Sequence, residues 1–320
     1  MASSPYLEAV PTSYLDHPNH KPSSHSITMP QQEYATSTSS ILPLAYGPDS
    51  SEVPAQPKTR RVLSLLLATN LCTLIFTVIP VLVELPNIKG NWYVGNDVIR
   101  LLEPIVAMPL YFAVILESGI FSRGSTKEKY LVGTLFMISA AIYQQGAGFH
   151  SAANMFKHPF VDFMDENPDL VSQYSFFNDF RTWVRTDWEH GIAHYMYAAG
   201  GILMAFVIAY LYRNVHDPMR SSIDKVLFVA ATLVYGLIIG SVAIEFPKGS
   251  IVALVLVVVY GFGVIGSFLF RREGKQARRL GRRYVLQYYL LAYVVAFIIV
   301  LGWVAHVRGF GNREDAGIKF

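Results

Sequence analysis

Apolar residues gather in seven long runs along this chain, and polar segments separate the runs. The runs cover residues 62–84, 101–121, 131–156, 188–212, 223–246, 249–270 and 284–307. Each run is close to the ~20 residues that an α-helix needs to cross the apolar core of a bilayer. The pattern predicts an all-α polytopic membrane protein, with seven transmembrane helices over 58–308 and a short carboxyl-terminal tail over 309–320.

The first 57 residues have a different character. They are rich in Ser, Pro, Thr and His and show no apolar periodicity. Such a segment buries too little surface to offset the entropy of ordering the chain, so we expect a disordered polar tail. The first residues lack the positively charged start and the apolar core that together mark a cleaved signal peptide. We therefore expect the first run to direct the chain to a membrane, that of the endoplasmic reticulum.

Basic residues are distributed unevenly between the polar segments. Lys and Arg gather before the first run and in every second loop after it, most densely between Arg271 and Arg283. The long segment 157–187 is mainly acidic. Because cytosolic loops carry the excess of positive charge, we expect a cytosolic amino terminus and a lumenal carboxyl terminus. We assign Arg271–Arg283 to this orientation signal and to contacts with lipid headgroups.

Composition supports a membrane protein and excludes other classes. Hydrophobic residues make up 52% and charged residues 15% of the chain, with a mean hydropathy of +0.34. The net charge of +3 and the absence of a basic binding motif give no sign of a nucleic-acid partner. Cys72 is the single cysteine, so the chain can form no disulfide within itself.

Most ionisable residues inside the apolar runs lie at the ends that this orientation places in the lumen. They are Glu84, Arg100, Glu103, His150, Glu189, His190, His194, Glu245, His306 and Arg308. A charge at the centre of a lipid-facing helix costs about 2.5 to 3.5 kcal/mol, so several at moderate depth favour a wet cavity. We expect a polar pocket that opens to the lumenal side. For Glu84, Glu245, His306 and Arg308, a position at the membrane interface is the alternative.

One chemistry for this pocket is metal-assisted hydrolysis. His190 and His194 are four residues apart and share a helical face; with His150 they can ligate zinc, while Glu189 or Glu103 activates water. Phe149-His150 and this HxxxH pair resemble the seven-span hydrolases that include alkaline ceramidases and adiponectin-type receptors. The resemblance implies a zinc-dependent lipid amidase or related hydrolase. That superfamily has its HxxxH near the last span, whereas this chain has it in the fourth.

The second chemistry is acid-initiated cyclisation of a lipid. A carboxylic acid in a pocket of low dielectric constant can protonate an olefin or epoxide, and a neighbouring base removes the final proton. Glu103, Glu189 and Glu245 are the candidate donors or bases, and His150, His190 and His194 are candidates for proton relay or cation stabilisation. Aromatic faces stabilise a carbocation, and aromatic residues flank the cluster at Tyr143, Phe149, Phe156, Trp188, Tyr195, Tyr197 and Trp303.

A wider pattern accompanies this cluster. The stretches 144–154 and 188–195, a seven-span core behind a polar tail and the absence of a DDxxD motif resemble the integral-membrane terpene cyclases of fungal meroterpenoid pathways, of the ascochlorin and macrophorin type. The resemblance implies a farnesylated, lipid-soluble substrate that is cyclised through a carbocation without a metal or other cofactor. It assigns no acid, so the residues named above rest on the pocket argument.

Two further hypotheses concern the function of the whole chain and the role of its longest polar segment. A transporter or a seven-span receptor is a third functional class, although we find no inverted repeat and the cytosolic loops are short and merely basic. Within the segment 157–187, aromatic residues alternate with polar ones from Leu170 to Trp188. We expect this loop to form an interfacial amphipathic helix that covers the pocket as a lid.

Overall fold

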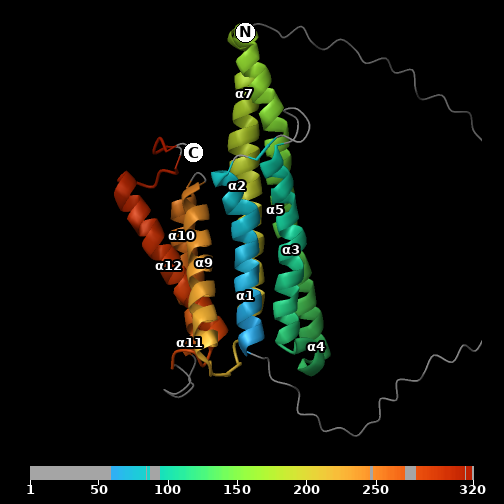
Figure 1. The fold of residues 1–320 in the computed structure, drawn as a ribbon, viewed down its shortest axis with the longest axis vertical. Helices are drawn as coiled ribbons and strands as arrows, with labels where there is room; N and C mark the ends of the chain where they lie inside the picture. Colours follow the sequence, from blue (N-terminus) through green and yellow to red (C-terminus); the bar gives the residue numbers. More distant parts are fainter. Residues whose placement is uncertain are drawn as a thin grey trace, which may run out of the picture. The chain divides into compact units, whose positions relative to one another are not determined.

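All of the regular structure described for this chain is helical (Figure 1). The computed structural model describes residues 59–83, 85–86, 94–245, 248–270, 279–313 and 315–318. The all-α prediction is confirmed over these residues. The predicted tail over 1–57, Glu84 and residues 271–278 of the basic segment lie outside them.

Six helical stretches of the described chain are long and apolar enough to cross a membrane. They are Thr59–Val78, Gly95–Glu117, Phe176–Leu211, Ser222–Glu245, Gly249–Leu269 and Tyr284–Val307. Each overlaps one of the predicted runs, so a multi-pass membrane protein is supported. The remaining run, 131–156, lies in α5 (Thr126–Glu166), where Gln144, Gln145 and His150 interrupt the apolar sequence.

The elements of these stretches follow one another with few breaks. The first stretch comprises α1 (Thr59–Thr73) and the π-helical η1 (Leu74–Val78), followed by α2 (Ile79–Leu82). Next come α3 (Gly95–Glu117) and the short α4 (Ile120–Arg123). After the central hairpin come α9 (Ser222–Glu245), α10 (Gly249–Leu256), the π-helical η3 (Val257–Ile265), α11 (Gly266–Phe270) and α12 (Tyr284–Val307).

The central hairpin corrects the prediction of a loop over 157–187, because the first part of this segment continues α5. α5 continues without a break for 41 residues, and α6 (Pro168–Gln173) turns the chain back. α7 (Phe176–Thr182), the π-helical η2 (Trp183–Ala193) and α8 (His194–Leu211) then form one helical stretch. The helix expected within Leu170–Trp188 agrees with α7 and η2. Figure 1 shows α5 and α7 extending beyond the ends of their neighbours. The acidic composition of 157–187, between two apolar runs, favoured a loop. Pro168 occupies the first turn of α6, where its missing N–H is tolerated.

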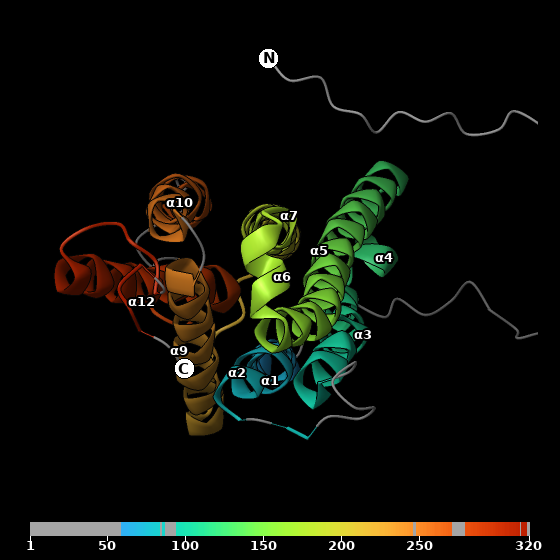
Figure 2. The same ribbon diagram turned by 90° about the horizontal axis from the view of Figure 1, so that it is seen from above.

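The helices pack in two groups that α1 connects. α3, α5 and α8 pack in sequence beside α1, and α9, α10 and α12 pack together on its other side, with α1 against α9 (Figure 2). The closest crossing is that of α5 and α8. Gly146 abuts the backbone of Tyr197, and Gly200 abuts the backbone of Tyr143. Small residues at such positions let two helices approach until their backbones touch.

Arg283 departs from the role expected for the basic segment. Its side chain is 1% exposed and donates hydrogen bonds to the carbonyl oxygens of Phe268, Leu269 and Arg213. The last carbonyls of a helix have no partner within that helix, so Arg283 satisfies those at the end of α11. The prediction that it contacts lipid headgroups is therefore wrong.

Candidate functional site

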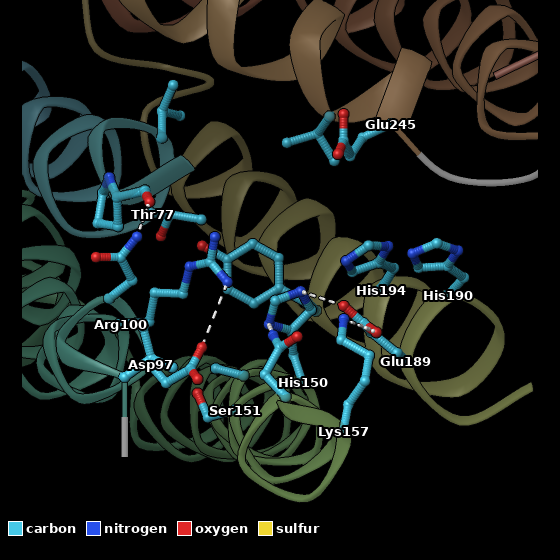
Figure 3. A pocket seen from close by; sticks show the side chains of 18 of the residues that line it. Thr77, Asp97, Arg100, His150, Ser151, Lys157, Glu189, His190, His194 and Glu245 are labelled. Atoms are coloured by element: carbon cyan, nitrogen blue, oxygen red, sulfur yellow. Dashed lines mark hydrogen bonds and ion pairs between the residues drawn. The ribbon is translucent and has the colours of Figure 1, made fainter. Parts of the chain in front are cut away.

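A cavity of about 1320 Å³ lies among the ends of several helices. The structure brings all six sequence-predicted site residues into its lining: Glu103, His150, Glu189, His190, His194 and Glu245. Figure 3 shows Asp97 and Arg100 on one side of this space and the three histidines with Glu189 on another. The residues thus share one cavity, and their chemical roles stay predictions.

A stripe of charged residues on α3 forms one wall. Asp97, Arg100 and Glu103 follow one another at intervals of three, which places them along one helical face. Arg100 Nη1 lies 3.7 Å from Asp97 Oδ1, and His158 Nε2 lies 3.4 Å from Asp97 Oδ2. A separation of 3.7 Å is too long for a hydrogen bond, so the pair interacts through charge alone.

Glu103 occupies the innermost position of this stripe. The residue is 1% exposed, and its Oε1 accepts hydrogen bonds from Thr73 Oγ1 at 2.9 Å and from the Tyr143 hydroxyl at 2.6 Å. Its Oε2 is also buried, and no hydrogen-bond partner for it occurs among the described residues. Burying a polar oxygen without a partner costs free energy. One carboxyl oxygen is therefore held in place by two hydroxyls, while the other has no partner among the described residues.

A cluster of histidines forms the facing wall. The His194 ring stacks on the rings of both His150 and His190, with centroids 4.8 Å and 5.3 Å away. Glu189 Oε2 accepts a bond from Lys157 Nζ at 2.8 Å, and its Oε1 lies 3.8 Å from His150 Nε2. Glu189 and His190 lie in the π-helical η2, a kind of irregularity that is frequent at functional sites.

This arrangement does not suit a zinc ion. Zinc ligands direct ring nitrogens and carboxylate oxygens at one common point, at about 2.0 to 2.2 Å from the metal. Here the three imidazoles stack face to face instead. Over the part of the chain that the structure describes, no group of three His, Cys, Asp or Glu side chains is placed to hold a metal.

A second, smaller cavity lies beside the first. It measures about 110 Å³, and both cavities are lined by Tyr197 and Val242. Its other walls are almost entirely apolar or aromatic, with Tyr111, Tyr143, Tyr235 and Tyr293 among them. The hydroxyls of Tyr143 and Tyr197 are 2.5 Å apart. The Glu103 carboxyl therefore sits where the large polar cavity meets a small aromatic one.

Glu245 has a partner that the sequence did not suggest. Arg313 binds it through two bonds, Nε to Oε2 at 2.9 Å and Nη2 to Oε1 at 2.7 Å. The backbone N–H of Arg313 also donates to the carbonyl of Ile244, so the carboxyl-terminal segment is fastened to the end of α9. Engaged in this way, Glu245 is a poorer candidate for proton transfer than Glu103.

Sequence reasoning missed three other cavity groups. Asp97 was not singled out, although its spacing from Arg100 and Glu103 marks the same helical face. Lys157 was assigned to a loop, and a helical reading of α5 would have placed it two turns from His150 on the same side. Arg313 could not be found in this way, because its pairing with α9 joins segments that are far apart in the chain.

Comparisons of this chain with protein-family models, with curated proteins and with solved structures found no match.

Proposed function

We propose that this protein is a membrane-embedded terpene cyclase that acts on a prenylated, lipid-soluble substrate, with Glu103 as the acid that starts the reaction. The observation that carries the proposal is the half-engaged Glu103 carboxyl at the junction of the two cavities. Two hydroxyls occupy Oε1, so a proton on the carboxyl belongs on Oε2, which has no described partner. Oε2 is then the atom that donates it.

The proposed topology has seven spans, with α5 as the third. Large apolar side chains on α5 are exposed, including Leu131, Met137 and Ile138, as expected for a face that contacts lipid. Gln144 and Gln145 are also exposed and lie about 27 Å along the helix from Thr126, near the limit of a ~30 Å core. The span in α5 then ends near these glutamines, and the rest of α5 stands outside the bilayer.

This topology agrees with the proposed orientation in the endoplasmic reticulum membrane. The amino terminus is cytosolic, the carboxyl terminus is lumenal and the cavity opens near the lumenal leaflet. Measured along α3 from Glu117, Glu103 is about 21 Å and Arg100 about 25 Å from the cytosolic end. A lipid in that leaflet can reach the cavity with its apolar part at the depth of Glu103.

The reaction proceeds as an isomerisation. Glu103 transfers its proton to a terminal double bond or epoxide of the prenyl chain, which leaves a tertiary carbocation. An internal double bond attacks that cation, a new C–C bond closes the ring, and a base removes one proton to form the product. Glu189 and the histidines are the candidate bases, and proton return to Glu103 completes the cycle without a metal or cofactor.

The aromatic lining supports a cationic intermediate. A cation over the face of a tyrosine ring is stabilised by ~0.5–2 kcal/mol, with the larger value where water is excluded. Tyr143 and Tyr197, with ring centroids 4.2 Å apart, lie next to Glu103, and Tyr235 and Tyr293 line the small cavity behind them. These rings can hold the charge as it migrates away from the acid.

The proposal is tested by Glu103→Gln, which keeps the shape and hydrogen-bonding capacity of the side chain but removes the acidic proton. With a farnesylated phenol as substrate, we expect cyclisation by purified protein to fall by ~10²–10⁴-fold, the usual contribution of a general acid. Glu117→Gln is the matched control, because Glu117 is on the same helix, outside the cavity, and paired with Arg61 at 2.9 Å.

A chelator provides the second arm of the test. Cyclisation should continue in its presence. Stoichiometric zinc in the purified protein, together with chelator-sensitive hydrolysis of a lipid amide, would replace the cyclase with the hydrolase alternative. Full activity of Glu103→Gln would show that Glu103 is not the acid that starts the reaction.

A further inference from the structure

Arg100 has an unusual position for a charged side chain in this cavity. It belongs to the cavity lining, and its buried Nε donates no hydrogen bond to any of the described residues. Its nearest charged neighbour, Asp97, is 3.7 Å away. A guanidinium normally forms short, often paired bonds with carboxylate or phosphate oxygens. Arg100 thus offers hydrogen-bond donors to the cavity, and the described residues offer its Nε no acceptor at hydrogen-bond distance.

Two other cavity cations differ from Arg100. Lys157 is bonded to Glu189 at 2.8 Å, and Arg313 is held by both oxygens of Glu245. Each of these two cations is therefore matched by an acceptor of the protein. Nε of Arg100 is shielded from solvent, so water does not supply the missing bond at that atom. A buried donor without a partner makes this cation costly to hold in the cavity, and an anionic ligand on Nη1 and Nη2 would offset part of that cost.

We propose that Arg100 is the anchor for an anionic, planar pair of oxygens on the head of the lipid substrate, such as a carboxylate or a phenolate next to a carbonyl. The inference rests on the proposed function, because it takes the ligand to be the cyclase substrate. Nη1 and Nη2 form the fork that receives the two oxygens. Asp97, one turn nearer the start of α3, lies beside the guanidinium, and His158 of α5 lies 3.4 Å from the other oxygen of Asp97.

The placement of Arg100 relative to Glu103 gives this anchor a consequence for the reaction. The two residues are three positions apart on α3, which is about 4.5 Å along the helix axis. A substrate held by its head at Arg100 must fold its prenyl chain back on itself to bring the far double bond to Glu103. Cyclisation requires such a folded chain, and the 1320 Å³ cavity has room for one.

Binding of unreactive probes tests the anchor apart from catalysis. The first probe is a hydroxybenzoic acid that carries a fully saturated farnesyl chain, which offers no double bond to protonate, and the second is its methyl ester. The full-length protein is placed in nanodiscs of phosphatidylcholine, and both dissociation constants are measured by calorimetry. We expect wild-type protein to bind the acid at least about tenfold more tightly than the ester.

Arg100→Gln should abolish this preference. Its affinity for the acid should fall by ~10–100-fold, the fold-change for losing hydrogen bonds to a charged group, while its affinity for the ester stays the same. Unchanged ester binding also shows that the variant is folded. Arg100→Lys should keep part of the preference, because it retains the charge and loses the fork. Arg61→Gln, at the opposite end of the bundle, should behave as wild type.

Three results would overturn the inference. They are equal binding of acid and ester by wild-type protein, an acid preference that survives in Arg100→Gln, and displacement of the acid probe by phosphatidic acid added to the nanodiscs. The last result would assign the site to a bilayer phospholipid. If the protein prefers the acid probe but cyclises no substrate, the role of Arg100 as an anchor stands and the cyclase proposal fails. The two failures are therefore distinguishable.

Discussion

At the scale of single residues, the surroundings of Glu103 depend on a short chain of hydroxyls. A hydroxyl carries one proton, so if Tyr143 donates to Glu103, the proton between the two tyrosines comes from Tyr197. Tyr143 thus orients the Glu103 carboxyl, and Tyr197 in turn orients the Tyr143 hydroxyl. Positioning groups of this kind hold a catalytic side chain in its productive geometry.

Tyr143→Phe tests the positioning role. The ring, which lies against Gly201, remains, and only the hydroxyl is lost. We expect cyclisation to fall by about 5- to 10-fold, which corresponds to roughly 1 kcal/mol for one hydrogen bond. Tyr212→Phe is the control, because its hydroxyl bonds to the carbonyl of Val114, away from the cavity. Both variants should lose similar thermal stability, and equal losses of activity would contradict the proposed role of Tyr143.

The residue scale also shows how far sequence reasoning reached at the site. Buried acids and histidines at one end of the runs were found because an ionisable group inside an apolar run is costly and therefore conspicuous. Their partners were not found, since Lys157 and Arg313 lie in polar segments, where a charged residue is common and gives no signal of a site. Glu245 pairs with Arg313 because the carboxyl-terminal segment folds back onto the end of α9. The apolar periodicity of the sequence does not predict such a contact.

At the scale of elements, the crossing of α5 and α8 sets the distance between Tyr143 and Tyr197. A side chain at Gly146 would overlap the Tyr197 backbone, so Gly146→Leu must push the helices apart. We expect a loss of ~1–3 kcal/mol in stability, the usual cost of overpacking, seen as a lower midpoint of thermal unfolding in detergent.

Activity of Gly146→Leu should fall along with its stability, because both tyrosines move relative to Glu103. Gly148→Leu is the matched control: it lies two residues away on α5, and a side chain there meets no atom within 4 Å. Equal unfolding midpoints for the two variants would show that α5 and α8 can move apart at this crossing without loss of stability, which contradicts the prediction.

The elements also show why the hairpin was mistaken for a loop. Apolar periodicity identifies helices that bury a face, but 157–187 is acidic and aromatic, and much of it is exposed. Aromatic contacts stabilise it instead: Phe160 lies 4.9 Å from Phe180 and 6.0 Å from Phe177, each measured between ring centroids. These pairs join α5 to α7 and are not visible in either segment alone.

At the scale of the whole molecule, the number of spans depends on whether α5 crosses the membrane. Cys72 is buried and is the only cysteine, so Cys72→Ser gives a background for single-cysteine labelling. Lys127→Cys and Ser175→Cys are placed at exposed positions near the two ends of α5. In sealed microsomes, an impermeant maleimide should label the first directly and the second only after detergent is added.

Labelling of both cysteines in sealed microsomes would contradict the seven-span topology and its orientation. The other spans were accessible from the sequence, since six of the seven apolar runs coincide with helices that are apolar enough to span a membrane. The hydropathy of α5 falls short of theirs because Gln144 and Gln145 interrupt it. This experiment therefore addresses the one span that composition leaves undecided.

The length of α5 has a practical consequence for imaging. A 36 kDa protein embedded in a detergent micelle offers few features for particle alignment in electron cryomicroscopy. About 20 residues of α5 follow the glutamines that mark the proposed edge of the bilayer, and α7 returns beside them. An antibody fragment raised against the turn at α6 would be joined to α5 and α8 by unbroken helix and would report their orientation without covering the cavity helices.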